Sequence, residues 1–496
     1  MTTYADRIRE NQMRFDEMAA AMSRERDGET AMAIAENAAR FASLCGIGRL
    51  ASPEIERNLR LLSERLYEVG SVDGDRGGTL LVATELYPVG GHTKVLGRLA
   101  SMLMDGGRVS LVLTRADNHY VPEELLGSVK ASGGEVVMLE DESRLTRAAR
   151  LRAMASSYDR SILMVHPEDA TTFVAFGTAR FNKSVFYFNH ANHTFWLGVS
   201  IADRILDVNR WGVELSCRFR GVSRERIESL GIPVELKETL MADGSAVRTE
   251  LGIPKSGTLV TAAGSPRKFR NFRKWRFGDL INKVLAENQS TYFLVIGAEP
   301  DAYPEWQWIS RRFGSRLKLM PQMSYSRLLR YFAASDVVVD SFPMSGWTSM
   351  MDAVRQKTAT VYPAGVTGPM DYFADASAFA PDIATAASII KRLLDNKDMR
   401  AKNIAEMTDR IKESMNPVAF RKRLSAALHS VSGHSIHDFV AAPEPEDSPL
   451  SAFIYAMTIR SKIRFALPGI VLKSVREGVS KHHELSLFGG RFVWRF

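Results

Sequence analysis

Short runs of apolar residues alternate along most of the chain with longer segments of helical periodicity. Continuous apolar runs, as opposed to strict alternation, are typical of parallel strands covered on both faces. Strands that alternate with helices indicate βαβ units, so the pattern predicts two doubly wound parallel sheets. The expected strands are 79–84, 108–114, 135–139, 161–166 and 184–189 for the first sheet, and 258–263, 291–297, 316–320, 336–340 and 358–363 for the second.

The two predicted sheets divide the chain into parts. Residues 1–75 show apolar positions at helical spacing, as in EIERNLRLLSERLYEVG, and predict a helical extension. We expect one Rossmann-like domain over 76–245 and another over 246–425. A linker and a basic tail follow over 426–496. The predicted fold class is therefore α/β, with two facing Rossmann-like domains that bind ligand at the carboxyl ends of their strands.

Composition excludes several protein classes. The chain has 496 residues, of which 45% are hydrophobic and 25% charged, as in ordinary globular proteins. The two cysteines, Cys45 and Cys217, are too few for a disulfide framework and fit a reducing compartment. We find no run of apolar residues long enough to span a bilayer and no secretory signal, so a cytoplasmic location is expected.

The net charge of +8 is unevenly distributed, with clusters at 265–276 and 451–496. Such clusters suit phosphates, nucleic acid or a membrane surface. The tail 450–496 mixes apolar and cationic residues, so it either contacts anionic lipid at the inner face of a membrane or packs back over the domains. In 265–276, SPRKFRNFRKWR, the aromatic residues recur every three positions, which favours a buried helical stripe over stacking on nucleic acid. Nucleic acid is therefore not an expected partner.

The segment DVVVDSFPMSGWTSMMDAVRQ, 336–356, predicts an anion site where a strand meets a helix. The N–H groups and dipole at a helix N-terminus attract phosphate. Gly346 allows close backbone approach, Thr348 and Ser349 add hydroxyl donors, and Asp352 lies one turn further on, where it suits a ribose diol. The alternative is that the hydroxyl residues only cap the helix.

Two other glycine-containing strand ends carry basic residues. TLVTAAGSPRKFRNF places Arg267 and Lys268 after a buried strand, where a cation can neutralise a diphosphate. LLVATELYPVGGHTKVL places Gly90, Gly91 and His92 at the start of a helix. Its spacing is neither a dinucleotide fingerprint nor a P-loop. His92 is a candidate general base, or else a capping or exposed histidine.

His190 and His193 follow the expected strand 184–189 in SVFYFNHANHTFWLG. Their spacing could hold zinc on a helix, but no third ligand has a suitable spacing, so no metal site is predicted. Contacts to substrate hydroxyl or phosphate groups are the preferred interpretation, with a structural role open for at least one of them.

These motifs together resemble a GT-B glycosyltransferase over about residues 78–425. Within this class, 337–362 is similar to the donor-binding segment of the O-linked N-acetylglucosamine transferase group and the bacterial HMW1C-type enzymes. The residues that match their pattern are Asp340, Pro343, Gly346, Thr348, Ser349 and Asp352. The resemblance implies diphosphate contacts from Lys268, Thr348 and Ser349, a ribose contact from Asp352, and Gln322 near the uracil. It also implies that His92 occupies the place of the histidine that lines the cleft after the first strand in these enzymes.

The chain departs from this pattern in several places. Trp347 stands where the group has histidine, the Gly-x-Pro before the last strand is missing, and no TPR-like repeats precede the domains. The Glu-x7-Glu motif of many retaining GT-B enzymes is absent.

The expected function is metal-independent transfer of a sugar from a UDP-sugar to a glycan, lipid-linked or protein acceptor, with no cofactor. The alternatives are a UDP-sugar 2-epimerase of the same fold and a catalytically degenerate nucleotide-sugar-binding protein.

Overall fold

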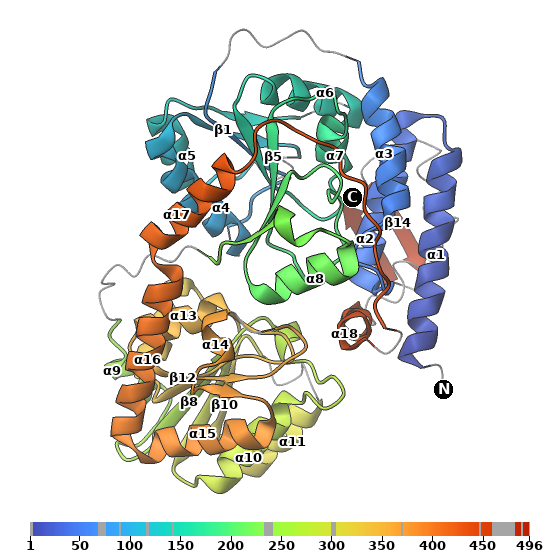
Figure 1. Cartoon of the computed structure of the whole chain (residues 1–496). Helices are drawn as coiled ribbons and strands as arrows, with labels where there is room; N and C mark the ends of the chain where they lie inside the picture. The colour runs from blue at the N-terminus through green and yellow to red at the C-terminus, as the bar shows by residue number, and fades with distance from the viewer. Residues whose placement is uncertain are drawn as a thin grey trace. The chain divides into compact units, whose positions relative to one another are not determined.

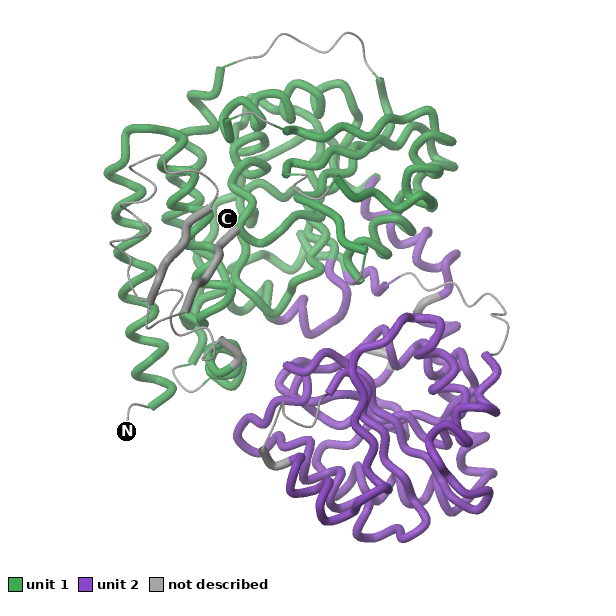
Figure 2. Tube along the Cα trace, turned by 180° about the vertical axis from the view of Figure 1, so that it is seen from behind, with its two compact units in different colours: residues 1–206, 215–228, 429–496 green, residues 207–214, 229–428 purple. Residues whose placement is uncertain are grey.

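The computed structural model describes residues 3–67, 76–88, 91–115, 119–140, 143–232, 242–298, 304–368, 371–445, 448–458, 482–487 and 490–495. The chain forms two compact units, which Figure 1 shows as a ribbon and Figure 2 distinguishes by colour. Unit 1 comprises residues 1–206, 215–228 and 429–496, and unit 2 comprises residues 207–214 and 229–428.

The predicted helical extension is present at the start of unit 1. Its helices are α1 (Tyr4–Arg24), α2 (Gly28–Cys45) and α3 (Pro53–Arg65). Each begins at a side chain that accepts a backbone N–H of the first turn, namely Thr3, Asp27 or Ser52. In α2, many of the buried positions are alanine, which allows its neighbours to approach closely.

A seven-stranded sheet forms the centre of unit 1, in the order β3-β2-β1-β4-β5-β6-β7. Its strands are β1 (Thr79–Ala83), β2 (Val109–Leu113), β3 (Val136–Met138), β4 (Arg160–Met164), β5 (Ser184–Asn189), β6 (Arg204–Asp207) and β7 (Ile227–Ser229). The pairs β1–β2, β1–β4, β2–β3 and β4–β5 are parallel. Every residue of β1, β2 and β5 is buried, as continuous apolar runs predict. The short strands β6 and β7 were not expected.

Helices cover this sheet and follow it along the chain. They are α4 (Gly91–Leu103), α5 (Glu123–Ala131), α6 (Arg144–Ala155), α7 (Ala170–Phe176) and α8 (Arg210–Arg220), with 3-10 turns η1 (Met104–Gly106) and η2 (Arg224–Arg226). After unit 2 the chain returns to unit 1. There Ser435 N donates to Asp203 Oδ1 at 2.8 Å and Glu444 N donates to Gly48 O at 2.7 Å.

The basic tail is only partly described. Helix α18 (Pro449–Thr458) packs on α1 and α2, and a hairpin of β14 (His482–Leu487) and β15 (Gly490–Arg495) follows. Residues 459–481, which hold much of the tail's expected lipid-binding character, lie outside the described residues. No helix in the described part of the chain is long and apolar enough to cross a membrane.

Unit 2 contains a parallel sheet in the order β10-β9-β8-β11-β12-β13. Its strands are β8 (Thr258–Ala263), β9 (Thr291–Ile296), β10 (Leu317–Met320), β11 (Val337–Val339), β12 (Ala359–Pro363) and β13 (Phe379–Ala380). The helices are α9 (Ser245–Glu250), α10 (Phe277–Glu287), α11 (Pro304–Phe313), α12 (Tyr325–Ala334), α13 (Thr348–Arg355), α14 (Asp371–Ala374), α15 (Ile383–Asp395), α16 (Lys397–Met415) and α17 (Pro417–His429). The 3-10 turns η3 (Pro266–Phe269) and η5 (Gly314–Arg316) precede α10 and β10, respectively. A core of aromatic and aliphatic side chains, including Phe269, Phe277 and Trp306, packs against the sheet.

Candidate functional site

The loop between β11 and α13 in unit 2 is organised by one buried carboxylate. Asp340 Oδ1 accepts hydrogen bonds from Ser341 N at 2.8 Å and Gly346 N at 2.7 Å, and Oδ2 accepts the Ser345 hydroxyl. Burial raises the pKa of Asp340 to about 6, although these hydrogen bonds and Lys268 oppose the increase. The sequence indicated Asp340 only as part of a motif, and its role in fixing this loop was not predicted.

Lys268 reaches the same loop from the end of β8. Its Nζ donates to Ser345 O at 2.9 Å, and burial lowers its pKa, an effect that Asp340 opposes. The backbone there is tightly packed, since a Cβ on Gly297 would lie 1.8 Å from Gly264 O. The predicted residues Lys268 and Gly346 are thus brought together through Asp340 and Ser345. Arg267, next to Lys268, is exposed.

The first turn of α13 lacks a side-chain cap. Trp347 occupies the N-cap position with φ 37° and makes no capping hydrogen bond, whereas Ser349 Oγ donates to Gly346 O at 3.3 Å. A Cβ on Gly346 would lie 2.5 Å from Ser349 Oγ and 2.8 Å from Asp340 Oδ1, so glycine is required here. Thr348 is exposed. Ser345 Oγ, in contrast, accepts the Trp347 N–H at 3.3 Å, as the alternative of helix capping by the hydroxyl residues expects.

Asp352 lies one turn further along α13 and is held by two neighbours. Tyr325 OH donates to Asp352 Oδ1 at 2.7 Å, and Arg355 lies 3.4 Å from the same oxygen. Tyr325 begins α12 and is 43% exposed, so this pair reaches the surface. Gln322 follows β10 and is exposed. Its side chain lies close to the backbone of Gly297, because a Cβ added to that glycine would be 3.4 Å from Gln322 Cγ. Tyr325 was missed because nothing in the local sequence links it to Asp352.

The expectation that 265–276 forms a helix with a buried aromatic stripe is wrong. After η3, Phe272 and Trp275 exchange backbone hydrogen bonds of 2.9 Å across a two-residue turn, and Arg273 adopts φ 50°. The two rings stack at 6.0 Å, with Arg273 over Phe272 and Lys274 over Trp275. Phe272 is only 3% exposed, so its ring offers no free face to a nucleic acid base.

His92 is the first of the three predicted histidines at the strand ends of unit 1. Its Nε2 lies 2.9 Å from Met164 O, and because a carbonyl only accepts, this nitrogen carries the proton. Its Nδ1 therefore has a lone pair, and this atom is buried with no partner among the described residues. Burial lowers the pKa of His92 and keeps it neutral near pH 7.

The predicted glycines next to His92 are only partly described. Gly91 begins α4 with open space around its Cβ position, whereas Gly90 lies outside the described residues.

His190 and His92 are brought together by the fold, since their ring centroids are 4.6 Å apart. Burial and the neighbouring histidines lower the pKa of His190 well below its usual value. His193 follows one turn later, is half-buried and also lowers the pKa of His190. The three expected catalytic candidates thus belong to one neighbourhood in unit 1.

Several residues of this neighbourhood were not predicted. His166, at the end of β4, lies with its ring 6.3 Å from that of His92 and stacks on Tyr87 at 5.8 Å. Its Nδ1 is 3.8 Å from Glu85 Oε1, and its Nε2 is 3.4 Å from Tyr87 OH. Burial lowers the pKa of His166, while Glu168 raises it. The strand-end rule could have found His166, since it closes the apolar run 161–166.

Neither cluster forms a metal centre. In the parts of the chain that the structure describes, no group of three or more histidine, cysteine or acidic side chains is placed to hold a metal ion.

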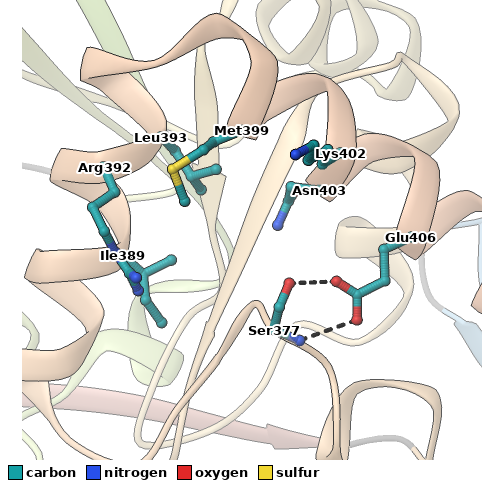
Figure 3. A pocket seen from close by; sticks show the side chains of 8 residues that line it. All are labelled: Ser377, Ile389, Arg392, Leu393, Met399, Lys402, Asn403 and Glu406. Atoms are coloured by element: carbon teal, nitrogen blue, oxygen red, sulfur yellow. Dashed lines mark hydrogen bonds between the residues drawn. The ribbon is translucent and has the colours of Figure 1, made fainter.

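Unit 2 also has a cavity of about 220 Å³ between α15 and α16, where Ser377 pairs with Glu406 (Figure 3). None of the candidate site residues lines this cavity.

Comparisons with known proteins show the fold. No protein-family model matches the chain, and no curated protein sequence matches it. Among solved structures, Anabaena HepE in complex with UDP-glucose matches with a TM-score of 0.54 and 16% identity, over 71% of this chain and 100% of that one. A Rickettsia africae glycosyltransferase matches with a TM-score of 0.54 and 10% identity, over 72% and 100%.

A Staphylococcus aureus TarM variant in complex with fondaparinux, α-GlcNAc-glycerol and UDP matches with a TM-score of 0.51 and 10% identity, over 71% and 100%. At these identities the likeness concerns the fold alone. The predicted fold class is confirmed: each unit has a parallel sheet between helices, and the chain has the two Rossmann-like domains of the GT-B glycosyltransferase fold with a helical extension.

Proposed function

We propose that this protein is a glycosyltransferase that transfers a hexosyl or N-acetylhexosaminyl group from a UDP-sugar to a glycan, lipid-linked or protein acceptor. The observation that carries the proposal is the loop between β11 and α13, where Asp340 and Lys268 fix the backbone beside an uncapped helix N-terminus. Such a site suits a diphosphate. The fold likeness to HepE, solved with UDP-glucose, supports a UDP-sugar as the donor.

On the donor side, residues of unit 2 bind and stabilise UDP. Lys268, Arg267 and the hydroxyl groups of Thr348 and Ser349 contact the diphosphate, and Asp352 accepts the ribose hydroxyl groups. Gln322 lies near the uracil, and Trp347 shapes the sugar pocket. Bond cleavage between the anomeric carbon and the β-phosphate oxygen leaves negative charge on UDP, which Lys268 and the α13 dipole stabilise without a metal ion or cofactor.

On the acceptor side, residues of unit 1 bind and activate the nucleophile. The acceptor oxygen or nitrogen forms the new bond to the anomeric carbon, and its proton passes to His92 Nδ1, the atom that has a free lone pair. His190 and His193 contact acceptor hydroxyl groups. The low pKa of His92 that burial causes keeps this base unprotonated at neutral pH.

Three finer points belong to the proposal. The match at 337–362 supports a relationship to the O-linked N-acetylglucosamine transferase and HMW1C-type group. A cytoplasmic location follows from the composition. The cationic residues of 450–496 support peripheral contact with an anionic membrane.

The proposal is tested by incubating the protein with UDP-glucose and UDP-N-acetylglucosamine and following the products by phosphorus and proton NMR. Release of UDP that increases with a suitable acceptor is the expected result. Conversion of the donor to its 2-epimer would favour the epimerase, and tight UDP binding without turnover would favour a degenerate binding protein. No interaction with either donor would overturn all three.

A further inference from the structure

We infer that the N-terminal helical extension positions three histidines near His92, namely His166, His190 and His193: Arg40 of α2 and Glu56 of α3 hold the two loops that carry them. The inference rests on the proposed function for what the histidines do, but the anchoring itself does not. The loop after β4 contains His166, and the loop after β5 contains His190 and His193.

The first anchor holds the loop after β4. Arg40 donates from Nε and Nη2 to Glu168 Oε1 at 3.3 and 3.2 Å. Glu168 lies two residues after His166, and its side chain is 11% exposed. Arg115 lies 3.8 Å from the same oxygen, so the carboxylate is held between an arginine of the extension and one of the sheet domain. A carboxylate this deeply placed needs such partners.

The end of the same loop is fixed by the sheet itself. Asp169 accepts hydrogen bonds from the hydroxyl groups of Thr84 at 2.7 Å and Thr114 at 2.5 Å, and it caps α7 through Thr172 N at 2.8 Å. Glu168 is thus held by the extension, whereas the next residue, Asp169, is held by the sheet domain. The position of His166 relative to Glu168 is therefore set in part by Arg40.

The second anchor holds the loop after β5. The Glu56 carboxylate is buried and accepts three consecutive backbone N–H groups, from Gly198 at 2.8 Å, Val199 at 3.0 Å and Ser200 at 2.8 Å. Gly198 has φ 128°, a conformation that glycine adopts most readily. This carboxylate fixes the end of the segment that begins at His190.

Other polar contacts between the extension and the sheet domain end elsewhere: Glu29 accepts Arg144 N and Leu145 N of α6, and Ser63 Oγ donates to Val174 O of α7 at 2.7 Å. Arg49 pairs with Asp16 at 2.9 Å, and this ion pair joins two parts of the extension without reaching the sheet. Arg40 and Glu56 instead end at the only two loops that carry the clustered histidines His166, His190 and His193 among the described residues.

The test compares Arg40→Ala with Arg49→Ala, since each removes one half-exposed arginine that pairs with a carboxylate. Carbon-13 NMR of labelled histidine, with His166 and His190 assigned by His→Gln variants, reports the loops without any substrate. We expect Arg40→Ala to shift the His166 resonance and its titration. Because the His166 ring lies 6.3 Å from that of His92, we also expect the UDP-sugar transfer or hydrolysis rate to fall about tenfold. Arg49→Ala should change neither, and Arg40→Lys should restore part of the rate.

Both arginine variants should bind UDP within about twofold of the unaltered protein, because the donor residues are elsewhere. Glu56→Gln should perturb the His190 resonance, and if it does not fold, Arg40→Ala still decides. Equal histidine spectra in Arg40→Ala and the unaltered protein would overturn the inference. Failure of the unaltered protein to bind UDP would instead count against the proposed function, and the histidine spectra would remain informative.

Discussion

The Lys268 ammonium group donates a hydrogen bond to the Ser345 carbonyl oxygen at 2.9 Å. The contact joins the ends of β8 and β11, which are paired in the sheet although the two contacting residues are 77 positions apart in the chain. It places a positive charge beside the uncapped start of α13. A cation and a helix N-terminus then act on the same anion.

The first prediction concerns this lysine. Lys268→Ala should weaken UDP binding about 10- to 100-fold, because a hydrogen bond to a charged group is worth about 1.5–3 kcal/mol. Titration calorimetry with UDP measures the change. Lys283→Ala is the matched control, since Lys283 pairs with Glu287 on the exposed face of α10. Equal affinities of the two variants would contradict the assignment of Lys268.

The second prediction concerns the space around Gly346. Gly346→Ala would place a Cβ 2.5 Å from Ser349 Oγ and 2.8 Å from Asp340 Oδ1, so the loop must shift. We expect a loss of about 1–3 kcal/mol in the free energy of unfolding of unit 2 and loss of UDP binding. Gly127→Ala, in α5 with open space at its Cβ position, should be neutral or slightly stabilising. Differential scanning calorimetry compares the two variants. A Gly346→Ala protein with unchanged stability that still binds UDP would contradict the close packing around Gly346.

The third prediction follows from the Asp340 carboxyl, whose pKa burial raises to about 6. An acid with a raised folded-state pKa binds its proton more tightly when folded, so its contribution to stability is complete below about pH 4 and is lost as the pH rises to about 6. The loss amounts to about 2–3 kcal/mol for a shift of this size. Asp340→Asn lacks this group and should therefore gain stability relative to the unaltered protein between about pH 4 and pH 7. Parallel Tm profiles of the two proteins over this range would contradict the prediction.

The fourth prediction separates the two nitrogens of His92. The amide of a glutamine can replace Nε2–H and keep the hydrogen bond to Met164 O, but it offers no lone pair at the position of Nδ1. His92→Gln should therefore fold and bind UDP normally, while the transfer rate falls about 100-fold or more. Steady-state kinetics with saturating donor checks this. A rate within a few-fold of the unaltered enzyme would exclude His92 as the base.

Much of the fold was predictable from the sequence, because parallel strands buried on both faces leave continuous apolar runs. All ten expected strands occur, with ends shifted by at most a few residues, as for 336–340 and β11 (Val337–Val339). The missed strands are β6, β7 and β13 and the hairpin strands β14 and β15 of the tail. The first three are short, and β6 (Arg204–Asp207) carries charge at both ends. The aromatic period in 265–276 misled because Phe272 and Trp275 face each other across a turn, a spacing that also fits one helical turn.

The site residues were predictable only where they stand at strand ends. Lys268, Gly346 and His92 follow strands, and the sheet brings each to the edge where its strand ends. Tyr325, Arg40 and Glu56 act through contacts between distant segments, such as the 128 residues that separate Arg40 from Glu168. No local pattern in a single sequence records such contacts, and a three-dimensional structure is needed to find them.

The most direct test of the proposed donor site is titration calorimetry of the purified protein with UDP, ADP and GDP, alongside Asp352→Ala. We predict that UDP binds more tightly than ADP and GDP and that Asp352→Ala loses this binding while keeping the Tm of the unaltered protein. Asp352 is the residue proposed to accept the ribose hydroxyl groups of UDP, and the hydrogen bond from Tyr325 OH holds its carboxylate in place. Absence of UDP binding, or equal UDP affinity in Asp352→Ala, would contradict the proposed donor site.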